Sequence, residues 1–392
     1  MNAHDLDQVL ADLFAWCRAR DFAGYDPFDG LNSRLFQRSP FKNSRAARLL
    51  WTQLCKRSPI NFRRIAKIPQ ERNAKGIALF ALAALSNYRR LKTKAAEAEA
   101  RSLVDDLLTM RLPGFKGAAW GYNFDWQGRA FFAPRGTPTI VPTAFAARAL
   151  VEADEILDHK EYLRLARTAC DFILNDLNRS QEASDEVCFS YSPLDRTRVF
   201  NASLLAAETL ARVGRATSEP SLCEWALRAA RYVVRRQRPD GSWSYGGDAY
   251  QTWADNFHTA FILTSLSRII EPCAGAREEF SDFLVRGCEF WRERFFLANG
   301  WPKYFPDRIY PADAHSAGAA IVALVELGGH IPGTLELAQK IADWTIVNLR
   351  SPEGYFYYQR RRLYTVCTPY MRWSEAWQAY ALARLAEVKR KR

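Results

Sequence analysis

Three carboxylates occupy similar places in three consecutive segments of the chain. Asp255 and Asp313 each stand just before an apolar stretch, and Glu375 lies about one turn inside another. Hydrolysis of a glycosidic bond needs two carboxyl groups that face one sugar ring, so these side chains are candidate catalytic groups. An Asp at the start of a helix also caps free backbone N–H groups, which explains Asp255 and Asp313 equally well but explains less of Glu375.

Two of the five histidines, His258 and His315, also recur at nearly the same place in consecutive segments. They suggest a second chemistry, proton abstraction beside a uronate carboxylate, as in polysaccharide lyases and uronyl epimerases. In that chemistry Asn or Arg neutralises the carboxylate while His or Tyr moves the proton. Residues of the other required types are Asn256, Tyr304 and Arg372. A single histidine is usually structural, but the repetition favours a function.

Five segments combine a turn with aromatic residues, and polar residues follow them. The segments are 120–126, 189–195, 241–245, 300–304 and 354–358. Aromatic rings stack on the C–H faces of sugars, while polar groups bind the hydroxyls, so we expect a saccharide. The candidate binding residues are Trp120, Tyr122, Asp125, Trp126, Arg129, Tyr191, Arg198, Asn201, Tyr245, Trp253, Asn256, Tyr304, Tyr358, Arg372 and Trp373. Alternatively, these aromatic residues only close the top of the core.

Helices must position these residues, because one apolar pattern recurs six times. Its markers are Ala84-Leu85, Ala149-Leu150, Thr209-Leu210, Ser265-Leu266, Ala323-Leu324 and Ala381-Leu382. The leucines are 65, 60, 56, 58 and 58 positions apart. The stretches that they end are rich in small residues on nearly every side, which is typical of helices packed on all faces. We predict that they form an inner ring.

Amphipathic helices are expected between these stretches, near 44–57, 96–110, 159–178, 220–236, 275–292 and 334–350. They form the outer ring. Six such hairpins bury their apolar faces by closing on themselves, so the predicted fold is all-α, an (α/α)6 toroid with short aromatic loops or β-hairpins at one mouth. We expect residues 44–392 to form the toroid and residues 1–43 a helix and loop packed on it. All outer-to-inner loops then emerge at one end, which is the candidate site.

Composition limits the partners. The chain has 392 residues, 48% of them hydrophobic, and a net charge of +12, which suggests an anionic partner. Nucleic acid is disfavoured, because the basic residues are spread through outer helices and no binding module is recognised. The eight cysteines form no Cys-x-x-Cys pair and no short Cys/His cluster, so we expect neither a zinc site nor a disulfide framework. We also expect no cofactor. No apolar run is long enough to span a membrane and no export signal is evident, so we expect a cytoplasmic protein.

A family resemblance adds to this interpretation. The segment Gln237-Arg-Pro-Asp-Gly-Ser-Trp243 resembles the Gln/Trp repeat of squalene cyclases and the wider α/α toroid superfamily, which includes six-hairpin glycosidases. With segments 24–31, 120–126 and 369–377, the whole chain resembles the VpsJ-type proteins of bacterial exopolysaccharide clusters. That resemblance implies polysaccharide biosynthesis or modification. The Asp-x-Asp-Asp acid of class II terpene cyclases does not occur, and neither His258 nor His315 has a nearby cysteine at zinc-ligand spacing.

The sequence thus predicts a carbohydrate-active protein that binds an acidic saccharide or a lipid-linked saccharide. Its reaction is that of a glycoside hydrolase, a polysaccharide lyase or a uronyl epimerase. The alternatives are a noncatalytic saccharide-binding protein associated with polysaccharide-assembly proteins, or a terpenoid cyclase-like enzyme. Two features stay open. Arg360-Arg361-Arg362 is either an anion site or a solvated loop, and the acidic loop 24–31 crosses the mouth, caps a helix or holds a cation.

Overall fold

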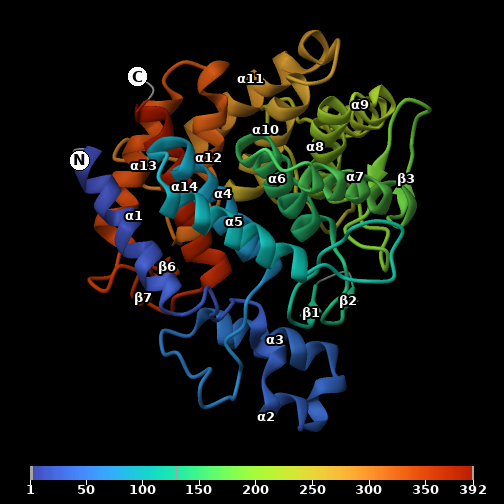
Figure 1. Cartoon of the computed structure of the whole chain (residues 1–392). Helices are drawn as coiled ribbons and strands as arrows, with labels where there is room; N and C mark the ends of the chain where they lie inside the picture. The colour runs from blue at the N-terminus through green and yellow to red at the C-terminus, as the bar shows by residue number, and fades with distance from the viewer. Residues whose placement is uncertain (1–2, 129–130, 391–392) are drawn as a thin grey trace.

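Six helices form a closed inner ring. The computed structural model describes residues 3–128 and 131–390. The inner helices are α4 (Ala74–Leu91), α6 (Ile140–Leu157), α8 (Phe200–Thr217), α10 (Asn256–Ile270), α12 (Ala314–Glu326) and α14 (Ala376–Arg390). Each packs against the next, and α14 packs against α4 (Figure 1). All six marker leucines are fully buried. The predicted all-α toroid is therefore confirmed.

Small residues let these helices approach closely. Every side chain from Ala74 to Ser86 in α4 is buried. Gly318 lies where α12 crosses α14, and a Cβ atom there would stand 3.0 Å from the backbone oxygen of Trp377. A larger residue would therefore push the two helices apart.

The outer ring differs from the prediction at one place. Five outer helices lie as expected: α5 (Lys94–Thr109), α7 (Lys160–Asn175), α9 (Pro220–Val234), α11 (Ala276–Phe295) and α13 (Thr334–Leu349). Beside α14 lies α1 (Ala3–Arg18), whose Leu6, Leu10 and Leu13 are buried in the main core. Its apolar residues recur at helical spacing along its whole length, so α1 covers the ring better than the helix expected at 44–57.

That helix exists as α3 (Arg45–Arg57), but placing it in the outer ring was wrong. Its main contacts are with η1 (Asp29–Asn32), η2 (Pro40–Asn43) and strand β1. Its buried Cys55 belongs to a small cluster with Ala66 and Ile68 that is separate from the main core, and Leu50 and Leu54 face solvent. The division of the chain at residue 43 stays a prediction.

The outer-to-inner connections lie at one end of the ring and carry the short strands. These are β1 (Trp126–Gln127) with β2 (Phe132–Ala133), β3 (Arg179–Ser180) with β4 (Cys188–Phe189), and β5 (Ala312–Asp313) with β6 (Gln359–Arg360) and β7 (Thr365–Val366), all antiparallel. The longest connection runs from α1 to α4 and holds α2 (Arg34–Gln37) and α3. Figure 1 shows α2 and α3 beyond the ring at the end where β1, β2 and β7 lie. We call this the loop end.

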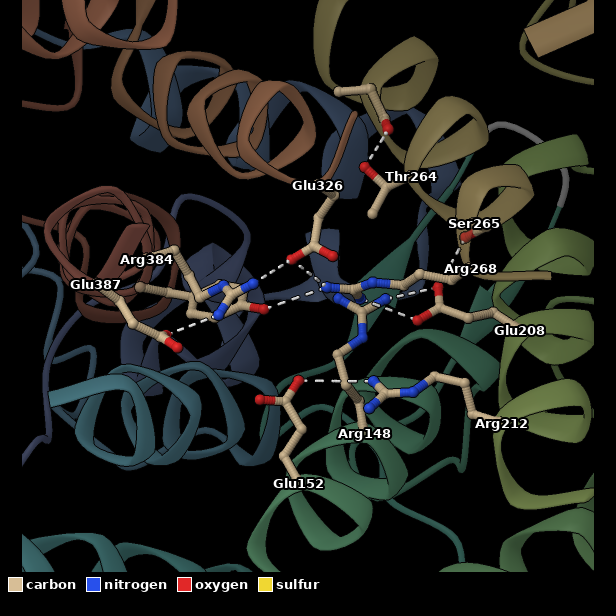
Figure 2. Close-up of polar contacts among 12 residues, drawn as sticks. Arg148, Glu152, Glu208, Arg212, Thr264, Ser265, Arg268, Glu326, Arg384 and Glu387 are labelled. Carbon is tan, nitrogen blue, oxygen red and sulfur yellow. Dashed lines mark hydrogen bonds and ion pairs between the residues drawn. The ribbon is translucent and has the colours of Figure 1, made fainter. Parts of the chain in front are cut away.

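Charged residues in the middle and last turns of the inner helices join these helices to one another (Figure 2). Glu208 of α8 accepts hydrogen bonds from Arg148 of α6 at 2.7 Å and from Arg268 of α10 at 2.9 Å. Glu326 of α12 pairs with Arg268 at 3.1 Å and with Arg384 of α14 at 2.9 Å.

Arg89 of α4 completes this circuit, because it pairs with Glu387 of α14 at 3.7 Å and with Glu152 of α6 at 3.2 Å. Burial acts against the charged form of Glu152, but the Arg89 and Arg212 guanidinium groups outweigh it and lower the pKa of Glu152 to about 2. Each inner helix is thus linked to both of its neighbours by an ion pair.

None of the helices within residues 3–128 and 131–390 combines the length and apolarity needed to cross a bilayer.

The ion-pair circuit can be tested with Arg268→Met. The substitution leaves Glu208 and Glu326 buried with one partner fewer, so we expect the free energy of unfolding to fall by about 3 kcal/mol. Urea denaturation measures the change. Arg164→Met is the control, because the pair between Arg164 and Glu161 is exposed and its loss should change stability by less than about 1 kcal/mol. Equal losses in the two variants would contradict a structural role for the circuit.

Candidate active site

A cavity of about 570 Å³ lies at the loop end of the ring. Its wall combines the first turns of inner helices, such as Lys75 of α4 and Asn201 of α8, with residues of the connections. The predicted site residues that line it are Tyr122, Trp126, Tyr191, Asn201, Tyr245, Trp253, Asp255, His258, Tyr304, His315, Arg372 and Trp373. Those that do not line it are Trp120, Asp125, Arg198, Asn256, Asp313, Tyr358 and Glu375. Arg129 lies outside the described residues.

Two of the predicted aromatic residues are core residues. Trp120 is fully buried, and its indole N–H donates to the carbonyl oxygen of Leu107 at 2.9 Å. Tyr358 is also fully buried and packs edge-on against Tyr370, with 4.9 Å between the ring centroids. Trp120 and Tyr358 therefore close the top of the core, and the prediction that they bind the saccharide was wrong.

Three of the predicted polar residues hold the connections in place. The Asn256 side-chain oxygen accepts from the indole N–H of Trp291 at 3.0 Å. Arg198 donates to Asp248 from two of its nitrogens, and Asp125 accepts from a backbone N–H of its own loop. These groups fix the loops around the cavity without facing it.

Two of the three candidate carboxylates are buried away from the cavity. The Asp313 oxygens accept from the backbone N–H groups of His315 and Ser316 at the start of α12 and from the Gln359 amide, and burial raises the pKa of Asp313 to about 6. Glu375 accepts from the backbone N–H of Phe356 at 2.8 Å. Its burial raises the pKa of Glu375 to about 8.

The local backbone explains where Glu375 lies. Met371–Glu375 form a single π-helical turn, η4, in which the Glu375 N–H donates to the Tyr370 carbonyl. Such wide turns occur mostly as single-turn bulges in α-helices, and they are frequent at functional sites. Here Arg372 and Trp373 line the cavity, whereas Glu375 lies in the interior beside α1 and α14.

His258 and Asp255 form an oriented pair at the cavity wall. The His258 Nδ1 atom lies 2.7 Å from an Asp255 oxygen, which also accepts from the Trp253 indole N–H at 3.2 Å. Asp255 caps α10 as well, because it accepts from the His258 backbone N–H. A carboxylate on Nδ1 holds that nitrogen as a donor and leaves Nε2 as a proton acceptor. The capping explanation and the functional explanation of Asp255 therefore both apply.

His315 is a neutral imidazole in an apolar setting. It is fully buried, stacks on Trp373 with 4.1 Å between ring centroids, and meets Phe257 edge-on at 4.5 Å. Burial lowers the pKa of His315 well below 6.5, so the ring is uncharged at pH 7. Neither ring nitrogen has a hydrogen-bond partner among the described residues. Buried polar atoms without a protein partner need another group, such as water or a ligand, to satisfy them.

The two histidines lie within reach of one sugar ring. The ring centroids of His258 and His315 are 4.0 Å and 4.5 Å from that of Phe257, so they are at most 8.5 Å apart. This is below the separation of about 12 Å above which two groups cannot flank one ring.

Four basic residues lie on the wall, Lys56, Lys75, Arg308 and Arg372, and the sequence had pointed only to Arg372. Arg372 is held by Asp26, whose oxygens lie 2.5 and 2.8 Å from its guanidinium nitrogens. The Lys75 ammonium makes no hydrogen bond or ion pair within the described chain, and burial with the nearby Arg372 charge lowers the pKa of Lys75 well below 10.5. Burial lowers the pKa of Lys56 to about 8.

A register argument would have found Lys75. It stands two residues after Asn73, which caps α4, as His315 stands two residues after Asp313, which caps α12. The Asp26 contact also shows what the acidic loop 24–31 does. Through Asp26 it binds Arg372, and its Phe28 lines the cavity.

Aromatic pairs supply flat surfaces on the wall. Tyr245 stacks on Trp253 with 4.6 Å between ring centroids, and the hydroxyls of Tyr122 and Tyr191 lie 3.2 Å apart. No three His, Cys, Asp or Glu side chains group as metal ligands in the part of the chain that the structure describes.

Comparisons with known proteins agree on the fold. The sequence matches no protein-family model and no curated protein. Among solved structures, the cellobiose 2-epimerase from Bacillus thermoamylovorans is 13% identical with a TM-score of 0.63, covering 81% of this chain and 90% of that one. The GH76 α-mannanase from Bacteroides thetaiotaomicron is 14% identical with a TM-score of 0.64, covering 83% and 89%. An unsaturated glucuronyl hydrolase specific for heparin is 15% identical with a TM-score of 0.60, covering 81% and 86%. The chain therefore shares the α/α toroid fold of these three structures.

The role of Glu375 can be tested with Glu375→Gln. Because burial raises the pKa of this carboxyl from 4.5 to about 8, the folded state holds one more proton than the unfolded state between those pH values. Wild-type stability therefore falls as pH rises through this range, and the variant lacks that loss.

We expect the two proteins to be about equally stable at pH 5 and the variant to be more stable at pH 8 by on the order of 3 kcal/mol. Urea denaturation at both pH values measures this, with Glu161→Gln as the exposed control. A difference between variant and wild type that is the same at pH 5 and pH 8 would show that Glu375 is charged in the fold.

Proposed function

We propose that this chain is a carbohydrate-active enzyme that moves a proton at a sugar carbon next to a carbonyl or carboxylate group, as an epimerase does. The observation that carries the proposal is that the imidazole rings of His258 and His315 line one cavity, with their ring centroids at most 8.5 Å apart. Epimerisation requires one group to remove a proton and another to return a proton to the opposite face of the same carbon. Two epimerases and a D-mannose isomerase are among the solved structures with this fold.

The wall supports a role for each group. Asp255 orients His258 and stabilises the imidazolium that forms when Nε2 takes a proton. His315, which is neutral, supplies or accepts the second proton. Removal of the proton leaves negative charge on the neighbouring oxygen, and the Arg372 guanidinium and the Lys75 amine are the groups on the wall that stabilise it.

The same wall argues against two-carboxylate hydrolysis. Asp255 is the one carboxylate among the described residues that line the cavity, and it is engaged with His258. Glycosidases need a second carboxyl group on the other side of the scissile bond. A terpenoid cyclisation is also disfavoured, because the fixed Arg372 charge would destabilise a carbocation.

An acidic saccharide fits the charge of the cavity. Arg372 is paired with Asp26 and His258 with Asp255, whereas Lys75 and Lys56 form no ion pair within the described residues. A uronate carboxylate would supply the missing ion-pair partner for Lys75 or Lys56, and a buried charge is costly when it has no partner. The resemblance to VpsJ-type proteins supports a place in bacterial exopolysaccharide production, with a lipid-linked saccharide as a possible form of the substrate.

Proton exchange is the direct test. Reducing disaccharides with and without a uronate residue, incubated with the protein in D₂O, should gain one deuterium at the carbon beside the carbonyl or carboxylate, as read by mass spectrometry and NMR. His258→Asn and His315→Asn should each slow this exchange at least about 100-fold, whereas His159→Asn on the outer surface should not.

Other products would contradict the proposal. Addition of water would show hydrolysis, and an unsaturated product would show elimination in place of epimerisation. Sugars that bind but never exchange would support a noncatalytic saccharide-binding protein.

The acidic part of the proposal has its own test in Lys75→Met. Loss of the buried amine removes a charge-assisted contact to a carboxylate, so KM for a uronate-containing sugar should rise about tenfold or more. KM for the matching neutral sugar should change little. A similar rise in KM for both sugars would show that Lys75 supports the cavity without recognising a charge.

A further inference from the structure

One segment of the loop end is exceptionally basic. Residues 30–70 contain ten Lys and Arg residues and no Asp or Glu, in a chain whose net charge is +12. Arg34, Arg38, Lys42, Arg57, Arg64 and Lys67 are exposed and form no ion pair with another described residue. We call residues 30–70 the basic segment. Such a concentration of charge attracts an anionic surface.

The basic segment also exposes large aliphatic side chains. Leu50 is 73% exposed, Ile60 is 73% exposed and Ile65 is 77% exposed. Leu35, Phe41 and Leu54 are exposed as well. Neighbouring exposed apolar residues of this size mark a surface that contacts a partner.

Helix α3 places its exposed stripe beside the cavity. Leu50, Leu54 and Arg57 follow the spacing i, i+4, i+7, so they share one face of the helix. Leu49, Gln53 and Lys56, each one residue earlier, line the cavity. One residue is a rotation of about 100° in an α-helix, so the exposed stripe borders the cavity-facing stripe.

A distant segment extends the same surface. The Tyr364 hydroxyl donates to the backbone carbonyl of Arg57 at 3.2 Å, which holds the β6–β7 turn against the end of α3. This turn carries the run Arg360–Arg362 and Leu363, which is 90% exposed. Basic and aliphatic side chains from two parts of the chain, about 300 residues apart, therefore meet at one place.

We propose that the basic segment and the β6–β7 turn dock on the surface of an anionic lipid bilayer. Arg and Lys would pair with lipid phosphates while Leu50, Leu54 and Leu363 enter the boundary between headgroups and acyl chains. Nucleic acid offers the phosphates but no apolar layer for these aliphatic chains. The exposed basic and aliphatic residues are spread over α2, η2, α3, the segment 58–70 and the turn, which suits a broad surface better than a single peptide.

Docking in this way sets the cavity close to the lipid headgroups, because α3 contributes to both surfaces. A saccharide carried on a lipid could then enter the cavity without leaving the membrane. Membrane docking of this kind does not depend on which reaction the cavity performs.

Vesicle flotation with the full chain tests the proposal. We expect the protein to float with vesicles of phosphatidylcholine mixed with phosphatidylglycerol, far less with phosphatidylcholine alone, and less as salt is raised. The pairs Leu50→Glu/Leu54→Glu and Arg57→Gln/Arg362→Gln should each weaken the binding at least about tenfold.

The matched controls are Val347→Glu, at a residue 79% exposed on α13, and Arg164→Gln, at an exposed residue on α7. Neither should change vesicle binding, and all variants should keep the wild-type melting temperature. The proposal is overturned if the protein ignores anionic vesicles, if the controls weaken binding as much as the test pairs, or if duplex DNA or polyglutamate binds where vesicles do not.

Discussion

An ion pair joins each inner helix to the next, and this circuit of buried charges constrains the whole ring. Arg89, Glu208, Arg268 and Glu326 each contact two other helices. Buried ion pairs contribute little net stability, because desolvation offsets their attraction. Their effect is on specificity. If one inner helix slid by a turn, a buried charge would lose its partners at a cost of several kcal/mol, so the six helices are held at one height.

The fixed height determines the chemistry at the loop end. All six inner helices begin at the loop end, so residues in their first turns arrive at the same level around the axis. Lys75, Asn201, His258 and His315 come from four different helices and share one wall for that reason. The connections then add the aromatic residues and Arg372. A site assembled in this way needs the closed ring, although none of its residues belongs to the ion-pair circuit.

The sequence predicted what depends on local pattern. Runs of small apolar residues predicted the inner helices, and the recurrence of His258 and His315 predicted their shared wall. Contacts between distant segments were not predictable. The pair between Asp26 and Arg372 joins residues 346 positions apart, and nothing local to either residue specifies it. The same holds for α1, whose amphipathic stripe is clear but whose place beside α14 depends on ring closure.

Charged residues are paired inside the ring but largely unpaired on the surface of the loop end, and this difference bears on function. Away from the loop end, the buried arginines of the inner helices are matched by glutamates, because an unpaired buried charge is costly. At the loop end the exposed cations of residues 30–70 need no partner, because water solvates them. Lys75 fits neither rule, since it is buried, lines the cavity and has no ion pair within the described residues. Its nitrogen lies 4.7 to 5.3 Å from the ring centroids of Phe145, Phe261 and Trp377, and its pKa is lowered, but neither effect supplies a counter-ion. An anionic group that arrives from outside would give the Lys75 amine the ion-pair partner that the described residues do not supply.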